Sequence, residues 1–241
     1  MRSSPRRTRA RSSTSPASDG ARGAICPRAF FLRSRMAPLD RGRRDNVRPS
    51  PDRRHALPPD GMLLVRERVR LRPLDEADAP AILSLYSDPG TMRYLARPRM
   101  SELAQAEELI AKTKAGYVDG TLLQLALERT ADRAFLGLAL LFNFNKGSAR
   151  AEIGYALATG HRSHGYMSEA LPALVDHAFG ALALNRLEAD IDPRNAASAR
   201  VLERLGFAPE GLMRERWIVN GEPSDSRVYG LLARDWRARR G

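Results

Sequence analysis

The sequence predicts one α/β domain, an α+β arrangement in which a single mixed sheet is flanked by helices. Strand-like and helix-like segments follow one another in the order β-α-α-β-β-β-α-β-α-β-β over residues 61–241. A first, mostly antiparallel half leads into a β-α-β-α run, which favours one sheet over two separate domains. Residues 61–241 also carry 25 basic and 23 acidic side chains, a net charge of only +2.

Residues 1–60 differ in composition and are expected to form a disordered tail rich in Arg, Ser and Pro. They hold 15 Arg, no Lys and 5 acidic residues, so they carry +10 of the total charge of +12. A segment this polar cannot bury enough apolar surface to offset the entropy of ordering it. A dispensable tail, a transit-type presequence, a basic arm for nucleic acid and an untranslated stretch before Met36 or Met62 are the open interpretations.

Two features of the tail narrow the class of protein. Cys26 is the only cysteine of the chain, which excludes an intrachain disulfide and a zinc cluster of thiolates. The apolar patch at residues 29–32 is too short for a membrane span or a secretory signal. A cytoplasmic protein that makes no membrane contact is therefore the default expectation.

The folded part is expected to begin with a strand at residues 63–74, where apolar and charged residues alternate until Pro73 ends it. Asp75 then opens a helix that continues to about Tyr86. The tripeptide Asp88-Pro89-Gly90 is expected to stop this helix.

A second helix is expected to start at Ser101, a good N-cap, and to end at Gly116 or Gly120. Three strand-like runs joined by short, turn-rich connections follow, so an antiparallel meander is the economical arrangement. These strands are expected at residues 121–128, 134–142 and 150–157.

The second half of the domain alternates helices with strands. Its first helix has a clear apolar face, and Pro172 predicts a bend or a local break within it. Asn195 is a good N-cap and Gly206 a good C-terminal residue for the next helix, and Asn220-Gly221 is a hairpin signal. The expected elements are a helix at 165–179, a strand at 185–192, a helix at 195–205 and a hairpin of 213–219 with 226–232.

The loop Arg162-Ser163-His164-Gly165 lies between a strand and a helix N-terminus. The free N–H groups of that terminus and the helix dipole together favour a phosphate. Gly165 allows close backbone approach, and Arg162 could add a charge-assisted contact. An ordinary strand-to-helix connection is the alternative. The stretch matches neither the phosphate-binding loop G-x-x-x-x-G-K-[ST] nor the dinucleotide motif G-x-G-x-x-G.

The stretch "HRSHGYMSEA" resembles motif A of the GNAT acyltransferases, written Q/R-x-x-G-x-G/A. Arg162 and Gly165 match its first and fourth positions, whereas Met167 stands where Gly or Ala is usual. "EIGYAL" and "NAASARVLERLGF" resemble the flanking blocks. "LRPLDEADA" and "DSRVYGLLARDW" are similar to the RimJ/RimL branch, which acetylates protein N-termini. The resemblance spans about residues 63–236.

The resemblance implies the GNAT fold and acetyl-CoA as co-substrate, and the spacing of the His, Asp and Glu residues predicts no metal. Backbone groups of the strand at 150–157 would pair with the pantetheine as an added strand would. Backbone N–H groups of the loop would hold the pyrophosphate. The residues expected to contact the coenzyme are Ile153, Tyr155, Leu157, Arg162, Ser163, His164, Gly165, Tyr166, Met167 and Asn195.

Acetyl transfer needs a base for the amine and a proton for the departing thiolate. The resemblance implies Glu152 as the base, although a solvated, ion-paired glutamate is the alternative. It also implies that Ser198 lies near the sulfur, as a proton donor or to orient a water. Asp225 and Tyr229 correspond to the final strand of the branch and could line the amine pocket, and Tyr229 could equally pack in the core.

The function that follows is transfer of acetyl from acetyl-CoA to a primary amine, with a protein N-terminal α-amine as the leading acceptor. A small amine (amino acid, polyamine or aminoglycoside) is an alternative on the same fold. A non-catalytic acyl-CoA-binding protein, with nucleic acid bound only through the tail, is an alternative of another class. The His, Asp and Glu residues show no metal-binding spacing, and either a monomer or a homodimer is compatible with the sequence.

Overall fold

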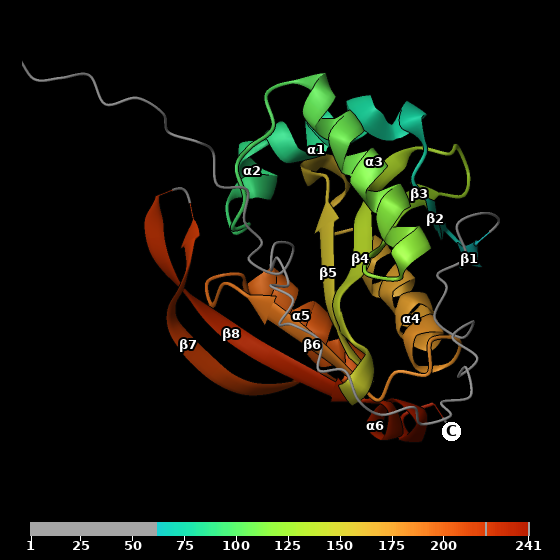
Figure 1. The fold of residues 1–241 in the computed structure, drawn as a ribbon, viewed down its shortest axis with the longest axis vertical. Coiled ribbons are helices and arrows are strands. Elements are labelled where there is room, and N and C mark those ends of the chain that lie inside the picture. Colours follow the sequence, from blue (N-terminus) through green and yellow to red (C-terminus); the bar gives the residue numbers. More distant parts are fainter. Residues whose placement is uncertain (1–61, 220, 241) are drawn as a thin grey trace, which may run out of the picture.

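The computed structural model describes residues 62–219 and 221–240, which form an eight-stranded sheet with helices on both faces (Figure 1). The strand order is β1-β2-β3-β4-β5-β6-β8-β7. Only the β5–β6 contact is parallel, and all other neighbours are antiparallel. The predicted mixed sheet is confirmed. The predicted tail at 1–60, with Cys26, lies outside the described residues.

The bounds of the elements are as follows. The strands are β1 (Leu64–Val65), β2 (Val69–Pro73), β3 (Leu123–Arg129), β4 (Phe135–Asn145), β5 (Arg150–Leu157), β6 (Arg186–Ile191), β7 (Ala208–Val219) and β8 (Glu222–Leu232). The α-helices are α1 (Ala79–Ser87), α2 (Pro89–Met92), α3 (Leu103–Asp119), α4 (Tyr166–Phe179), α5 (Ala196–Leu205) and α6 (Ala233–Ala238).

Successive side chains of a strand point to opposite faces of the sheet, so the hydrophobic core has two parts, one on each face. Ile153 of β5 and Leu187 and Ala189 of β6 pack with α4 and α5 in the larger cluster. Leu138 of β4 and Ala156 of β5 pack with α1 to α3 on the other face. The helices accordingly lie on the two sides of the sheet, while the β7–β8 hairpin extends away from them (Figure 1).

Several predicted elements differ from the observed ones. Residues 63–74 form two short strands rather than one, because the chain turns at Arg66, whose N–H donates to Val69 O (2.9 Å). Asp88 caps the additional helix α2 instead of only ending α1, because an Asp N-cap followed by Pro also starts a helix. The final strands β7 and β8 begin earlier than expected, and α6 follows them.

The helix α4 matches the predicted segment and continues through Pro172, so of the predicted bend or local break, the break is wrong. Proline removes one N–H donor, but its neighbours in this helix are buried and hold it in place. The predicted meander of three antiparallel strands is confirmed as β3, β4 and β5, and the predicted caps of α5 are found at Asn195 and Gly206.

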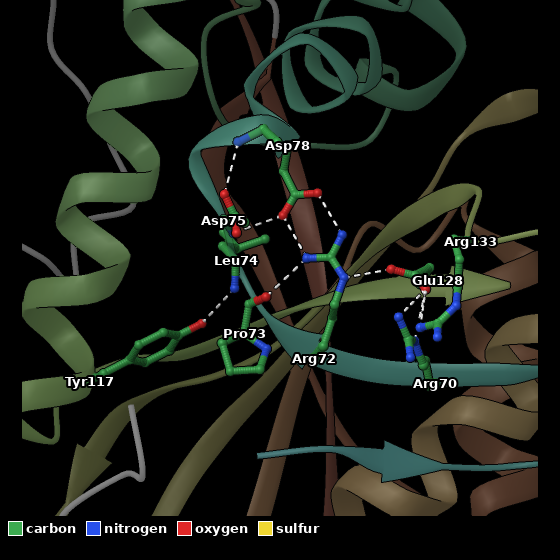
Figure 2. A network of polar contacts seen from close by, with 10 residues as sticks. Arg70, Arg72, Pro73, Leu74, Asp75, Asp78, Tyr117, Glu128 and Arg133 are labelled. Carbon is green, nitrogen blue, oxygen red and sulfur yellow. Dashed lines mark hydrogen bonds and ion pairs between the residues drawn. The ribbon is translucent and has the colours of Figure 1, made fainter. Parts of the chain in front are cut away.

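The block "LRPLDEADA" forms a buried ionic network that joins β2 to the start of α1 (Figure 2). The Arg72 guanidinium donates to both carboxylate oxygens of Asp78 (2.8 and 2.7 Å) and to Glu128 of β3 (2.6 Å). Asp78 is 6% exposed and Glu128 is 3% exposed. Asp78 also accepts from the N–H of Asp75 (2.8 Å). The charged residues of this block therefore have a structural role, because each buried charge is paired with an opposite charge.

Candidate active site

The sheet opens between its two parallel strands. β5 and β6 pair only from Arg150–Arg186 to Glu152–Glu188, and beyond that point β5 pairs with β4 alone. The N–H of Ala158 donates to Leu136 O on β4 (2.9 Å), whereas the carbonyl of Ala149 accepts from Asn185 at the start of β6 (2.6 Å). Because backbone direction alternates along a strand, the odd-numbered residues of β5 point their N–H and C=O groups toward β6.

Three of the residues predicted to bind the coenzyme therefore share one free edge. Ile153, Tyr155 and Leu157 direct their backbone groups into the opening and have no strand partner there among the described residues, although the Leu157 carbonyl accepts from the Arg162 side chain. An extended, amide-containing ligand could pair with this edge as an additional strand would.

The loop that follows β5 brings a helix N-terminus to the same end of the opening. Gly165 is the N-cap of α4 with φ +81°, and Ser163 also has a positive φ of +65°. The first helical hydrogen bond runs from Glu169 N–H to Gly165 O (3.1 Å), so the preceding N–H groups have no helical acceptor. Four donors and the dipole form a site for an anion.

The departure from motif A at Met167 does not fill this loop. The Met167 side chain is 6% exposed and packs in the core beneath α4, as does the ring of Tyr166. Both side chains thus anchor α4 in the core, and the backbone N–H groups of both residues precede the first helical hydrogen bond. The His164 ring stacks on Tyr166 with 5.7 Å between centroids.

Arg162 is tied to the protein rather than free. Its guanidinium donates to Leu157 O (3.2 Å), Gly90 O (3.3 Å) and the Thr91 hydroxyl (3.0 Å). These contacts connect the loop to α2 and fix its path. A direct ligand contact by Arg162 stays a prediction.

Arg68, from the turn between β1 and β2, is a site residue that sequence reasoning missed. Its Nε donates to the Glu169 carboxylate (2.7 Å) and one Nη donates to His164 O (3.2 Å). Its other Nη lies 3.5 Å from where a Cβ at Gly165 would stand. Arg68 thus neutralises Glu169 in the first turn of α4 and adds positive charge to the anion site.

Glu152 lies at the base of the opening, on the face of the sheet opposite α4. The Asn143 amide donates to its carboxylate (2.9 Å), and no ion pair involves it among the described residues. Burial, aided by the negative charges of Asp190 and Glu188, raises the pKa of Glu152. The alternative of a solvated, ion-paired glutamate does not fit this half-buried, unpaired carboxyl group. A raised pKa suits a group that exchanges protons near neutral pH.

Ser198 lies across the opening, in the first turn of α5. Its hydroxyl is 2.7 Å from the Tyr155 hydroxyl, and burial raises the pKa of Tyr155 to about 12. Asn195 caps α5 by accepting from the Ser198 N–H (3.1 Å). The hydrogen bond holds Asn195 and Ser198 together at the start of α5, and the Ser198 hydroxyl contacts Tyr155 of β5.

The two residues predicted to line the amine pocket have different surroundings. Tyr229 is 0% exposed, and its hydroxyl donates to Glu203 of α5 (3.4 Å). This favours the packing interpretation over the pocket interpretation, because the side chain has no surface to offer a ligand. Asp225 is half-buried and accepts from the Glu215 N–H (2.9 Å), where it supports an irregular part of β7.

Comparisons with known proteins agree with this geometry. Residues 68–208 match the family model described as an acetyltransferase (GNAT) domain. YoaA of Bacillus subtilis, an uncharacterized N-acetyltransferase, is 31% identical over 170 residues, covering 70% of this chain and 96% of YoaA. The alanine N-acetyltransferase of ribosomal protein uS5 from Escherichia coli is 29% identical over 106 residues, covering 44% and 55% of the two chains.

A solved structure also has the same fold. Mycobacterium smegmatis RimJ in complex with CoA-disulfide aligns with a TM-score of 0.64 and 27% identity, covering 69% of this chain and 82% of RimJ. The chain belongs to the GNAT family and is an acetyltransferase, a class of enzyme that uses acetyl-CoA and an amine acceptor. No helix among residues 62–219 and 221–240 is long and apolar enough to cross a membrane.

Proposed function

We propose that this enzyme transfers acetyl from acetyl-CoA to a primary amine, with the α-amine of a protein N-terminus as the leading acceptor. The observation that carries the proposal is the parting of β5 from β6 directly beside the uncapped N-terminus of α4. Pantetheine amides would pair with Ile153, Tyr155 and Leu157, and the pyrophosphate would lie on the N–H groups from Ser163 to Met167.

The chemistry then falls to groups on the two sides of the opening. Glu152, directly or through a water, accepts a proton from the acceptor ammonium, and the free amine nitrogen attacks the thioester carbonyl. The C–N bond forms, the C–S bond breaks, and the thiolate takes up a proton on the side where Ser198 and Tyr155 lie. Because Ser198 is a weak acid, we assign it to orienting a water or stabilising charge.

The choice of a protein α-amine is supported by the names of relatives, one of which acetylates alanine of ribosomal protein uS5 and another of which is RimJ. We also propose that the enzyme belongs to the RimJ/RimL branch, that residues 61–241 form its catalytic domain, and that it acts in the cytoplasm. Whether the enzyme works as a monomer or a homodimer does not affect the chemistry.

The test has two steps. Acetyl-CoA and CoA should raise the melting temperature, whereas ATP and NAD should not. CoA thiol release should then be followed with hexapeptides that begin with Ala or Ser, and with spermidine and lysine. We expect release with the peptides, and loss of most of it in Glu152→Gln, while Glu210→Gln, in an ion-paired glutamate on β7, retains it.

Equal thermal shifts from all four compounds would reduce the loop to a general anion site. Binding of acetyl-CoA without thiol release from any amine would favour the non-catalytic alternative. Release with spermidine alone would place the acceptor among small amines.

A further inference from the structure

Three carboxylates, two on β6 and one directly after it, follow the alternation that places Glu188 on the face that bears Glu152. Glu188 lies opposite Glu152 in register, and Asp190 and Asp192 follow at every second position. Each of the three has an arginine partner. The pairs are Arg150 and Arg186 with Glu188, Arg216 with Asp190, and Arg194 with Asp192.

Asp190 differs from its neighbours because two of its partners, Arg216 and Trp217, come from the edge strand β7, on the far side of β8. Its carboxylate accepts from the Trp217 indole N–H (3.1 Å), from the Arg216 Nε (2.8 Å) and from the Ser226 hydroxyl. Its side chain is only 14% exposed. These four residues, from three strands, are called the Asp190 cluster below.

The cluster fixes an irregular part of β7. Between the pairs Met213–Ser226 and Trp217–Ser224, three residues of β7 lie opposite Asp225 alone. Glu215 within this bulge has φ +50°, and its N–H is held by Asp225 (2.9 Å). Bulges commonly redirect side chains next to active sites. Here the bulge turns Arg216 and Trp217 inward to Asp190.

The position of the cluster links it to the acceptor side of the site. Asp190 lies two residues beyond the last β5–β6 pair, where β6 leaves β5, with Glu152 at the base of the opening. The cluster is on the sheet face opposite the one that packs on α4 and α5. An acceptor approaching Glu152 from that face therefore meets the indole and the guanidinium as neighbouring groups.

We propose that Asp190 is a positioning residue for the amine acceptor, because it holds Trp217 and Arg216 as the wall of the acceptor site beside Glu152. The proposal rests on the proposed transferase function. Asp190 itself touches no reacting atom, since its oxygens are occupied by the cluster. The wall it fixes supplies one flat aromatic surface and one cation, a combination suited to a peptide backbone and its carbonyl groups.

The test compares two aspartates with like chemistry. Asp176 of α4 also accepts from an indole, that of Trp236 (2.9 Å), and from arginines, Arg66 (3.0 Å) and Arg240, but at the C-terminal end of α4. In Asp190→Asn the KM for a Ser-initiated hexapeptide should rise about tenfold or more, the worth of one charge-assisted hydrogen bond. The KM for acetyl-CoA should stay unchanged. Asp176→Asn should change neither constant.

A pH profile separates positioning from simple loss of packing. The charged groups around Glu152 are Glu188 and Asp190 of β6 and Arg216 of β7, and Asn143 of β4 donates to it. Asp190→Asn removes a negative charge and frees Arg216, and both changes favour ionised Glu152. The acid limb of kcat/KM should therefore move to lower pH in Asp190→Asn and stay in place in Asp176→Asn.

A second readout does not depend on turnover. Trp217 and Trp236 are the only tryptophans, so Trp236→Phe leaves Trp217 as the single emitter. Titration of the Trp236→Phe protein with the Ser-initiated hexapeptide should change the fluorescence of Trp217. In the double variant that also carries Asp190→Asn, this change should be smaller. Acetyl-CoA should still raise the melting temperature of both proteins. Trp217→Phe, which retains a ring but loses the N–H donor, should raise the peptide KM without a change of fold.

The proposal is overturned if the peptide leaves Trp217 emission unchanged while acetyl-CoA stabilises the protein, or if both asparagine variants shift the peptide KM equally. Absence of any acetyl-CoA effect would instead contradict the proposed function itself, which makes the two failures distinguishable.

Discussion

Gly165→Asp is the substitution that most directly tests the anion site at α4. Gly165 has φ +81°, a conformation that Asp and Asn tolerate better than other side chains. The position is also an N-cap, where Asp is favoured over Gly by only about a few tenths of a kcal/mol, which offsets a small part of the backbone strain. Apart from the residues next to it in the chain, the described part of the structure places only Arg68 Nη near the added Cβ, at 3.5 Å. We therefore expect a folded protein.

The effect on coenzyme binding is electrostatic. For a carboxylate about 5 Å from a diphosphate with roughly two charges, Coulomb's law at an effective dielectric constant of about 40 gives about 3 kcal/mol. The neighbouring Arg68 would compensate part of this repulsion, although it already pairs with Glu169. The expected loss of CoA affinity is therefore about 10- to 100-fold.

Calorimetric titration of CoA into the wild type, Gly165→Asp and Gly165→Asn checks this value. Asn has the size and backbone tolerance of Asp without its charge, so it should lose much less affinity. The deficit of the Asp variant should also shrink as salt is added, because the repulsion is partly screened. If Gly165→Asp binds CoA as tightly as the wild type, the diphosphate does not lie at this helix end and the reasoning fails.

Three further predictions concern charge and burial. Arg68→Ala should weaken CoA binding about five- to tenfold by calorimetry, and Arg68→Ala with Glu169→Gln should recover part of it, since the exposed carboxylate repels the anion. Asp78→Ala should lower the free energy of unfolding in urea by about 3 kcal/mol or more, because it leaves Arg72 without two of its contacts; a loss below about 1 kcal/mol would contradict this. Burial lowers the pKa of His177, so the unfolded chain takes up the proton first and stability should fall as pH drops below about 6.5. His177→Gln should flatten this fall in melts between pH 7.5 and 5.5.

Strong local signals allowed α4, β6 and α5 to be predicted. The helices α4 and α5 combine an apolar face with caps at both ends, and the bounds of α5 follow from Asn195 and Gly206. The prediction of a single strand at residues 63–74 was wrong because a clear local signal is missing there. The charged run Arg66-Glu67-Arg68 interrupts the alternation, but it contains no Gly, Pro or Asn, so no turn residue marked the turn.

The candidate site was only partly predictable, because long-range contacts decide which charge is free. Alternation in "NRLEADID" predicts the strand β6 but cannot show that its carboxylates are paired while Glu152 is not. Arg68 precedes its loop by about a hundred residues and gave no local signal. Tyr229 and Asp225 share a strand with Ser226, yet it is the hydroxyl of Ser226 that reaches the cluster.

One parallel contact in an otherwise antiparallel sheet explains why the site lies where it does. A parallel pair requires a crossover, and the helices that follow β5 and β6 both begin at the carboxyl ends of these strands. The N-termini of α4 and α5 are thereby brought to one end of the sheet, one with an open anion site and one with Ser198. Because β5 and β6 part beyond Glu152, an unpaired strand edge lies between these helix ends. A ligand that carries phosphates at one end and amides along its length would meet complementary groups there. The proposed coenzyme site therefore follows from the topology, and in the same proposal the acceptor approaches from the Glu152 face.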